Sequence, residues 1–336
     1  MLTPLQIGAL SIPSPVLLAP MAGVTDLPFR RQAYRFGAPY VVSEMVAGDE
    51  LARARRDMVR RVAGAGVVSP LVIQLAGREA QWMAEGARLA EDAGADVIDI
   101  NMGCPSKSVT NGASGSALMR DPDHALRLID ATVGATSRPV TLKMRLGWDV
   151  GTLNAPSIAA RAEASGVRMI VVHGRTRCEF FRGIADWAAI RATVDAVRIP
   201  VIANGDIATA DDARRALQQS GAAGIMIGRG AQGKPWRTAS VAQALAAGGE
   251  AKDPPDPVIG ESLAALYEDS LAFYGRDLGL RIARKHIAWA IDGGASALSD
   301  DARRRARAEI CRMDCPTRVQ RALRDVFTGG LHLEAA

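Results

Sequence analysis

Cys104 is the side chain in this sequence whose surroundings best suit a chemical reaction. The apolar run at residues 97–100 predicts a buried parallel strand that ends at Asn101. Gly103 and Pro105 end this strand pattern, and a polar stretch rich in Ser and Gly follows them. A lone cysteine is most often a small buried hydrophobic residue. The polar neighbours of Cys104 favour a different interpretation, in which the thiol lies at the lip of a strand, faces a cleft and reacts.

Further residues with useful chemistry fall where other predicted strands end. In a barrel of parallel strands, the carboxyl ends of all strands meet at one mouth, and catalytic groups gather there. Each residue alone has an ordinary structural interpretation, such as a satisfied core histidine or a lysine in an ion pair. Together they indicate a binding site. The residues that fall at this mouth are Pro20, Met21, Ala22, Gln74, Asn101, Cys104, Lys143, Arg145, His173, Arg175, Asn204, Gly205, Asp206, Gly228 and Arg229.

Two of these features predict a site for flavin mononucleotide (FMN). The glycine-rich ends of the strands that begin at residues 201 and 224 offer backbone N–H groups to a phosphate. Lys143 lies within an apolar strand, so it must face a negative group or lose its charge. Such a lysine would stabilise negative charge on the N1 and C2 side of a reduced flavin, and Gln74 would bond an edge of the ring.

Residues 228–233 also match the dinucleotide pattern GxGxxG. That pattern requires a following strand with an acidic residue about 20 positions on, and this sequence lacks it. A mononucleotide phosphate site is therefore the better interpretation of the loop. With a flavin beside it, the thiol of Cys104 could give the proton that completes hydride addition to an activated double bond, or act as a base in the reverse oxidation.

The elements that position these residues alternate along most of the chain. Short apolar runs rich in Val and Ile begin at residues 16, 40, 71, 97, 140, 169, 201 and 224, and amphipathic stretches separate them. Eight strand-helix units predict an α/β fold, a closed (β/α)8 TIM barrel. Residues 5–12 predict a small hairpin that closes the bottom of the barrel.

A change of composition marks the end of the barrel pattern. Gly, Pro and Asp concentrate at residues 247–257, and the strand pattern stops there. Helices are predicted beyond it, at residues 259–275, 278–292, 300–312 and 316–327, which indicates a small all-helical bundle. We therefore expect a catalytic barrel domain at residues 1–246, a linker at 247–258 and a helical domain at 259–336.

Composition excludes several classes of protein. A hydrophobic content of 48% in 336 residues supports a sizeable core, and no apolar stretch reaches the roughly 18 residues of a membrane span. The cysteines, at 104, 178, 311 and 315, show no paired framework, which predicts free thiols in a reducing cytoplasm and no metal site. The net charge of +5 and the arginine clusters at residues 53–61, 175–182 and 303–307 favour a polyanionic partner.

Several stretches of the sequence resemble the flavin-dependent tRNA-dihydrouridine synthases, and the resemblance is closest to their bacterial B subgroup. They are APMAGVTD (19–26), DINMGCPSK (99–107), LKMRLGW (142–148), VHGRTR (172–177), ANGDI (203–207) and IGRGA (227–231). The resemblance implies an FMN-binding barrel followed by a helical domain that recognises tRNA. It also implies NADPH-dependent reduction of the C5–C6 double bond of a D-loop uridine, at tRNA position 17, after the base is flipped into the pocket. Hydride would pass from N5 of FMN to C6, and Cys104 would give the proton to C5.

The same resemblance assigns roles to other residues. Asn101 and Arg175 are expected to meet the uracil or the nearby backbone. Arg281, Arg284 and Lys285 share one face of a predicted helix and are expected to bind tRNA phosphates, although a solvated charged face has the same spacing. The resemblance gives no reason to expect a metal, a membrane or a protein partner. The residues expected to line the flavin are Pro20, Met21, Ala22, Gln74, Lys143, His173, Asn204, Gly205, Asp206, Gly228 and Arg229.

Two other functions fit part of the sequence. A flavoprotein similar to dihydroorotate dehydrogenase would share the barrel, FMN and an Asn-x-x-Cys-Pro turn in which the cysteine is a base. Such an enzyme acts on a free pyrimidine and has no use for the helices after residue 257. A non-catalytic RNA-binding protein built on the same barrel would have no need for Cys104, Lys143 and His173 at one mouth. Bound yellow flavin would exclude the second alternative, and salt-sensitive tRNA binding would exclude the first.

Overall fold

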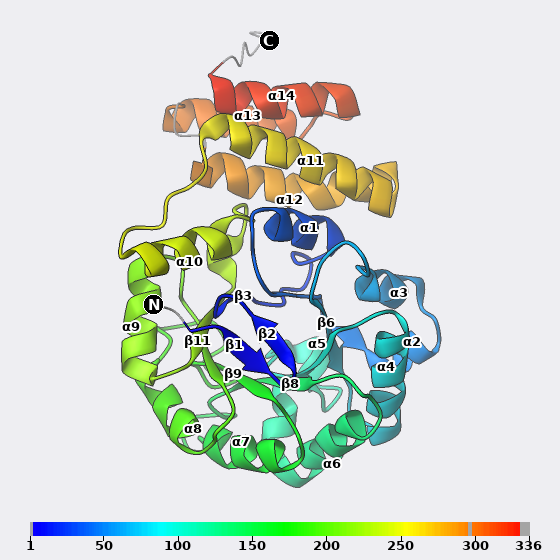
Figure 1. Cartoon of the computed structure of the whole chain (residues 1–336). Coiled ribbons are helices and arrows are strands. Elements are labelled where there is room, and N and C mark those ends of the chain that lie inside the picture. Colours follow the sequence, from blue (N-terminus) through cyan, green and yellow to red (C-terminus); the bar gives the residue numbers. More distant parts are fainter. Residues whose placement is uncertain (1–2, 295–297, 330–336) are drawn as a thin grey trace.

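A closed ring of parallel strands lies at the centre of the structure, a computed structural model that describes residues 3–294 and 298–329 (Figure 1). β4, at one end of the strand order, pairs with β3 and also with β6 near the other end, so the sheet closes on itself. The chain therefore has the (β/α)8 TIM barrel that its sequence predicts. The strand segments of this ring are β3 (Val16–Leu18), β4 (Val41–Val42), β5 (Val46–Ala47), β6 (Leu71–Ala76), β7 (Val97–Met102), β8 (Val140–Arg145), β9 (Met169–His173), β10 (Val201–Asn204) and β11 (Gly224–Ile227).

The second barrel strand is divided. The sequence predicts one run from residue 40, whereas the structure has two short segments, β4 and β5, which both pair with β6. Between them, the hydroxyl of Ser43 accepts a hydrogen bond from the backbone N–H of Gln74 at 3.0 Å and donates to the carbonyl of Glu44 at 2.8 Å. The side chain thus takes the place of a backbone partner, and the chain bends so that Met45 reaches the mouth of the barrel.

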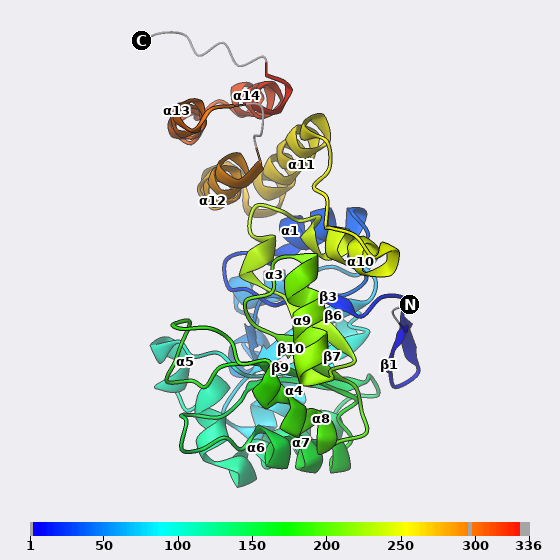
Figure 2. The same ribbon diagram turned by 90° about the vertical axis from the view of Figure 1, so that its left-hand side faces the viewer.

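A hairpin of β1 (Leu5–Ile7) and β2 (Leu10–Ile12) covers the amino-terminal end of the barrel, as the sequence predicts. Its side chains Leu5, Ile7 and Ile12 are buried in one cluster with Leu17 and Val97 from the barrel strands. Figure 1 shows the hairpin across the near end of the ring. Figure 2 shows it at one side of the barrel, with α5 (Lys107–Thr110) at the opposite side. The mouth formed by the carboxyl ends of the strands therefore lies away from the hairpin.

Helices surround the strands because each connecting segment turns an apolar stripe toward the sheet. The ends of α9 show how the sequence sets their bounds. The hydroxyl of Thr209 accepts the N–H of Asp212 at 3.0 Å, the carboxylate of Asp212 accepts the N–H of Thr209 at 3.0 Å, and Gly221 ends the helix in the left-handed conformation. The helices around the barrel are α1 (Leu27–Arg35), α2 (Gly48–Ala52), α3 (Arg56–Val62), α4 (Ala80–Asp92), α6 (Pro122–Val133), α7 (Ala155–Ala164), α8 (Arg191–Asp195), α9 (Ala210–Ser220) and α10 (Arg237–Ala247), with 3-10 turns η1 (Gly115–Arg120), η2 (Ala188–Ile190) and η3 (Arg229–Ala231).

The helices predicted beyond the barrel are also present, and they form a separate stack on one side of it (Figure 2). They are α11 (Asp256–Tyr274), α12 (Arg276–Gly294), α13 (Asp300–Ile310) and α14 (Pro316–Thr328). α11 and α12 cross closely at Gly279, where a Cβ atom would lie 2.5 Å from the carbonyl oxygen of Ser270, so a side chain is excluded there. α11 is tied to α1 by an ion pair between Arg31 and Asp269 at 2.5 Å. Among the described residues, no helix combines the length and the apolar character needed to cross a bilayer.

Candidate active site

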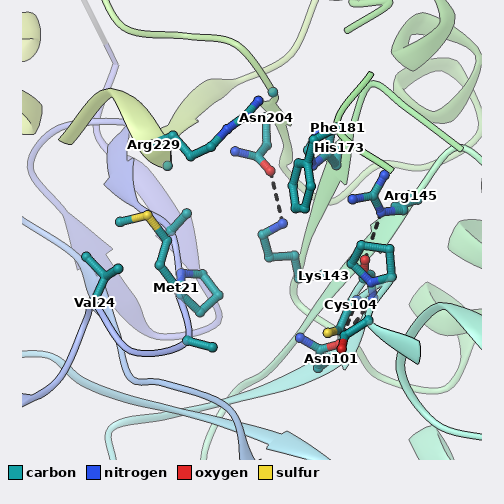
Figure 3. Close-up of a pocket in the computed structure, with 18 of the residues that line it drawn as sticks. Met21, Val24, Asn101, Cys104, Lys143, Arg145, His173, Phe181, Asn204 and Arg229 are labelled. Atoms are coloured by element: carbon teal, nitrogen blue, oxygen red, sulfur yellow. Dashed lines mark hydrogen bonds between the residues drawn. The ribbon is translucent and has the colours of Figure 1, made fainter. Parts of the chain in front are cut away.

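A cavity of about 840 Å³ opens at the carboxyl ends of the barrel strands, where the sequence predicts a site (Figure 3). We call it the first cavity. Its volume suits a cofactor-sized ligand. The residues expected to line the flavin all lie on its wall, together with Asn101 and Cys104. They are Pro20, Met21, Ala22, Gln74, Lys143, His173, Asn204, Gly205, Asp206, Gly228 and Arg229.

The floor of this cavity is a chain of hydrogen-bonded side chains on β6, β7 and β8. Nδ2 of Asn101 donates to Oε1 of Gln74 at 2.8 Å, and Nε2 of Gln74 donates to Oδ2 of Asp99 at 2.7 Å. The hydroxyl of Thr141 donates to Oδ1 of Asp99 at 2.6 Å. Burial raises the pKa of the Asp99 carboxyl, and the bonds from Thr141 and Gln74 oppose that rise. The two amides are therefore fixed in orientation by the protein itself.

Cys104 is held by this chain through its backbone. Oδ1 of Asn101 accepts the N–H groups of Cys104 at 3.0 Å and of Gly103 at 3.3 Å. The carbonyl of Cys104 accepts the N–H of Ser116 at 3.1 Å and its hydroxyl at 2.8 Å. The side chain is a free thiol, partly exposed on the cavity wall. Cys104 thus lies on the cavity wall, and the position of its backbone depends on Asn101.

Lys143 is a partly buried cation with room for a ligand. Its Nζ donates to Oδ1 of Asn204 at 3.0 Å, and Nδ2 of Asn204 donates to the carbonyl of Met226 at 2.8 Å. Burial, helped by the nearby charge of Arg145, lowers the pKa of Lys143 to about 8. In the part of the chain that the structure describes, its ammonium forms no ion pair with a carboxylate. An ammonium has three N–H donors, so donors remain for a negative or carbonyl group in the cavity.

His173 lies on the same wall as a neutral ring. Burial, followed by the charges of Lys143 and Arg145, lowers its pKa well below the usual value. The backbone passes very close to this ring at Gly205, where a Cβ atom would lie 2.9 Å from Cδ2 of His173. Gly205 also has a φ of +116°, so the loop after β10 depends on glycine at this position.

Arg175 lies outside the cavity wall, behind Asp206. Only 1% of Arg175 is exposed, and its guanidinium donates to both oxygens of the Asp206 carboxylate and to the carbonyls of Arg182 and Gly183. Arg229, which does line the cavity, donates to Oδ1 of the same carboxylate at 3.1 Å. Burial raises the pKa of Asp206, but the bond and charge of Arg175 outweigh it and lower the pKa overall. Arg175 therefore holds the Asp206 carboxylate in place, and this carboxylate in turn bonds Arg229.

Several residues of the cavity were not singled out as site residues from the sequence. Val24 and Met45 come from loops on one side, and Phe180 and Phe181 come from the long loop between β9 and η2. The ring of Phe181 is 49% exposed and packs against the guanidinium of Arg229, with 4.9 Å from Cζ to the ring centroid. The only sequence signal for this loop was that Phe180 and Phe181 fall within the arginine cluster at residues 175–182. Loops have no periodic pattern of apolar residues from which their structure could be predicted.

The basic residues of α12 lie apart from the first cavity and do not act together in the structure. Arg284 donates to Oδ1 of Asp314 at 3.2 Å, beyond the end of α13. Lys285 points the other way, with its Nζ 3.3 Å from the position that a Cβ atom on Gly23 would take. Arg281 is exposed. The three residues share a helix, as predicted, but Arg284 and Lys285 face different neighbours.

Comparison with known proteins gives this site its context. The family described as dihydrouridine synthase (Dus) matches residues 17–323. A protein of Rhodobacter capsulatus named "Probable tRNA-dihydrouridine synthase" is 56% identical over 326 residues, which cover 96% of this chain and 98% of that relative. The "tRNA-dihydrouridine synthase B" of Xanthomonas axonopodis pv. citri is 46% identical over 285 residues, which cover 85% of this chain and 86% of that relative. The solved structure of morphinone reductase in complex with tetrahydroNAD shares the fold, with a TM-score of 0.52 at 15% identity over 77% of this chain and 93% of that chain.

Proposed function

The chain belongs to the flavin-dependent dihydrouridine synthase family, and from this premise we propose that it reduces the uridine at position 17 in the D-loop of tRNA, with FMN and NADPH. Family membership makes it a tRNA-dihydrouridine synthase, an oxidoreductase whose substrate is tRNA. One observation carries the proposed chemistry: Cys104, just after β7, and Lys143, on the neighbouring strand β8, line the same cavity. One of these side chains can give a proton, and the other can hold negative charge.

The donors of the first cavity fit FMN. Figure 3 shows Lys143 between Arg229 and Cys104, so the cavity has a cationic middle and a cationic end. Arg229 and the backbone N–H groups of Gly205 and Gly228, on the loops after β10 and β11, suit a phosphate. Lys143 suits the side of the ring that becomes negative on reduction. The apolar residues after β3 and the bonded amides of the floor complete the walls for the ring.

Cys104 is the proposed proton donor. A bound reduced flavin supplies the hydride that adds to C6 of the uracil. The thiol of Cys104 then gives its proton to C5, which quenches the enolate-like charge left on the pyrimidine. Asn101 keeps the thiol in place through the N–H of Cys104, and Lys143 keeps a positive charge beside the ring. Both groups are positioned before substrate arrives, which is the arrangement that a proton transfer of this kind requires.

We propose a positioning role for Arg175 in place of the expected contact with uracil. Its guanidinium is buried and bonded to Asp206 and to backbone carbonyls, which leaves it no path to a base in the first cavity. Arg175 would act by holding Asp206, which in turn orients Arg229 toward the phosphate.

The proposal extends to the two parts of the chain. Residues 1–246 would form the catalytic domain, residues 259–336 the tRNA-recognition domain, and residues 247–258 the linker between them. α12 lies on the side of the helical stack that is nearer the mouth of the barrel (Figure 2). Arg281 and Lys285 on this helix reach solvent and would meet tRNA phosphates. A tRNA substrate also fits the expected cytoplasmic location.

Mapping of dihydrouridine in cellular tRNA tests the proposed function. tRNA from a strain that lacks this gene should lose dihydrouridine at position 17 and keep it at other positions of the D-loop. The purified protein should be yellow, release FMN on denaturation, and restore the missing nucleoside when given NADPH. Loss at another position would overturn the assigned uridine alone. Unchanged tRNA, together with reduction or oxidation of a free pyrimidine, would favour the dihydroorotate dehydrogenase-like alternative.

A further inference from the structure

A second cavity, of about 270 Å³, lies between the barrel and the helices α11 and α12. It adjoins the first cavity across two short loops: Val24 and Met45 line the first cavity, and their chain neighbours Gly23 and Glu44 line the second. Its remaining walls come from α1, α3, α11 and α12. Residues 23–24 and 44–45 therefore form a wall that the two cavities share.

Three partly exposed cations of the second cavity, Arg60, Arg61 and Lys285, form no salt bridge within the described chain. Arg60 lies over the ring of Tyr274, with 5.7 Å from its Cζ to the ring centroid. Arg61 donates to the carbonyl of Met45 at 2.5 Å. Among the described residues, neither of them nor Lys285 forms an ion pair with a carboxylate, and all three are partly exposed to solvent. Their charges are thus available to a negatively charged ligand.

The acids on the inner side of the same cavity are occupied by the protein. Oε1 of Glu44 accepts the N–H of Gly23 at 2.6 Å. Asp26 accepts the N–H of Phe29 and the hydroxyl of Tyr274, each at 3.0 Å. Burial, more than any other cause, raises the pKa of Asp26 to about 6. Asp57, the third carboxylate of this cavity, pairs with Arg55 at 3.0 Å. Asp26 and Asp57 lie close enough to Lys285 and Arg61 for their charges to interact, but none of the three carboxylates forms a salt bridge with these cations in the described chain.

Arg30 adds a buried positive charge to the wall of this cavity. Its side chain is fully buried on the wall of this cavity, at 0% exposure. Nε donates to the carbonyl of Thr25 at 3.2 Å and Nη2 to the carbonyl of Ala63 at 3.0 Å, but Nη1 has no hydrogen-bond partner within the described chain. Buried donors are almost always bonded, so the free Nη1 is an unused donor on a residue that lines this cavity, although it lies near the loop at Gly64.

We propose that the second cavity is a phosphate subsite for the tRNA strand whose uridine enters the first cavity. The proposal rests on the proposed function, and it adds a site outside the flavin cavity. Arg60, Arg61 and Lys285 hold one phosphodiester group through charged hydrogen bonds. Because the two cavities share a wall, the phosphodiester group bound by these three residues is the one next to the reacting nucleotide. Binding of the tRNA backbone at this point keeps the flipped nucleotide unstacked while its base is reduced.

Salt-dependent binding of unmodified tRNA to the flavin-loaded protein tests the subsite. The double variant Arg60→Gln/Lys285→Gln should bind tRNA about tenfold more weakly, and the slope of log K against log salt should shrink by about 1, the value for one lost phosphate contact. The control Arg198→Gln makes a single charge change at an exposed residue before β10, at the opposite end of the barrel. It should change affinity less than about twofold and leave the slope unaltered.

Two further measurements keep the outcome clear. Flavin content and thermal midpoint should match the wild type in both variants. If the double variant does not fold, Arg60→Gln alone, which removes a cation assigned only to this subsite, should still weaken tRNA binding about threefold. Reduction of the flavin by NADPH should be unchanged. If the double variant binds NADPH more weakly and tRNA normally, the cavity holds a phosphate of the reductant, and the proposal is wrong. The proposal is also wrong if the double variant binds tRNA as tightly as the control does. The binding measurement does not depend on turnover, so a wild type that binds tRNA but reduces no uridine would refute only the proposed function.

Discussion

The floor of the first cavity and the seam between the barrel and its helical stack bury polar groups in opposite ways. The floor consists of Gln74, Asp99 and Asn101, which bond one another before any ligand is present. The seam is the contact of α11 and α12 with α1 and residues 21–26. There, within the described chain, neither ring nitrogen of His286 is bonded, and Arg30 keeps Nη1 free. The polar groups of the floor are thus bonded within the protein, whereas the seam contains buried polar atoms that no described residue bonds.

Replacement of Cys104 should have the largest effect, because it removes the group that the floor holds in place. Cys104→Ala keeps the backbone bond to Asn101, so flavin should remain bound while uridine reduction slows by about 10²–10⁴-fold. Single-turnover oxidation of the reduced enzyme by tRNA measures this rate. Cys178→Ala, at an exposed thiol, is the matched control and should react normally. A Cys104→Ala enzyme with a near-normal rate would exclude the thiol as the acid.

Breaking the floor at Asn101 should have the next largest effect. Asn101→Ala removes the acceptor for the N–H of Cys104 and leaves Oε1 of Gln74 unbonded. We expect reduction to slow by about 10- to 100-fold, as for a misplaced proton donor. The loss should persist at saturating tRNA, since the role is positional. A loss that higher tRNA concentration restores would show instead that Asn101 only binds the substrate.

The pH dependence of flavin binding should expose the charge of Lys143. With a pKa lowered to about 8 by burial and by Arg145, the ammonium is charged below that pH and neutral above it. FMN affinity of the apoprotein should therefore fall as pH rises through about 8, and Lys143→Met should bind about tenfold more weakly with no such fall. Fluorescence titration of FMN at a series of pH values measures both. A wild-type affinity that stays level above pH 8 would remove Lys143 from the flavin site.

The smallest effect concerns the seam, and it should have the opposite sign. His286 is 1% exposed and lies against Phe29 at 5.3 Å and Trp289 at 5.6 Å between ring centroids. Burial lowers its pKa to about 3, so the ring is neutral at physiological pH. His286→Phe should raise the free energy of unfolding by about 1 kcal/mol, because it removes unbonded polar atoms from the interior. Denaturant unfolding measures this change.

The matched substitution on the floor makes the contrast sharp. Gln74→Leu should destabilise the protein by about 1–3 kcal/mol, since it leaves Oδ2 of Asp99 and Nδ2 of Asn101 without the partner that Gln74 supplies. If His286→Phe also destabilises the protein, the seam is bonded as completely as the floor, and the difference drawn between them disappears.

The sequence by itself determined the barrel and most of the first cavity. Apolar runs of strand length that alternate with amphipathic helices leave few ways to bury both faces of a sheet, and a closed barrel is one of them. Once the strands are parallel, residues such as Gln74, Asn101, Lys143 and Asn204 must meet at one mouth, whatever the loops do. Strand direction and alternation are local properties, so they can be read along the chain.

Only the tertiary structure decided the roles that depend on loops and on the contact between distant segments. Arg175 follows a strand end as predicted, yet the fold of the next loop turns its guanidinium toward Asp206 and away from the cavity. Phe181 and Met45 reach the site from irregular segments. The second cavity exists because Lys285 of α12 comes to rest beside Gly23, more than 250 residues earlier in the chain. Such contacts arise from the packing of whole elements, and no local pattern of side chains encodes them.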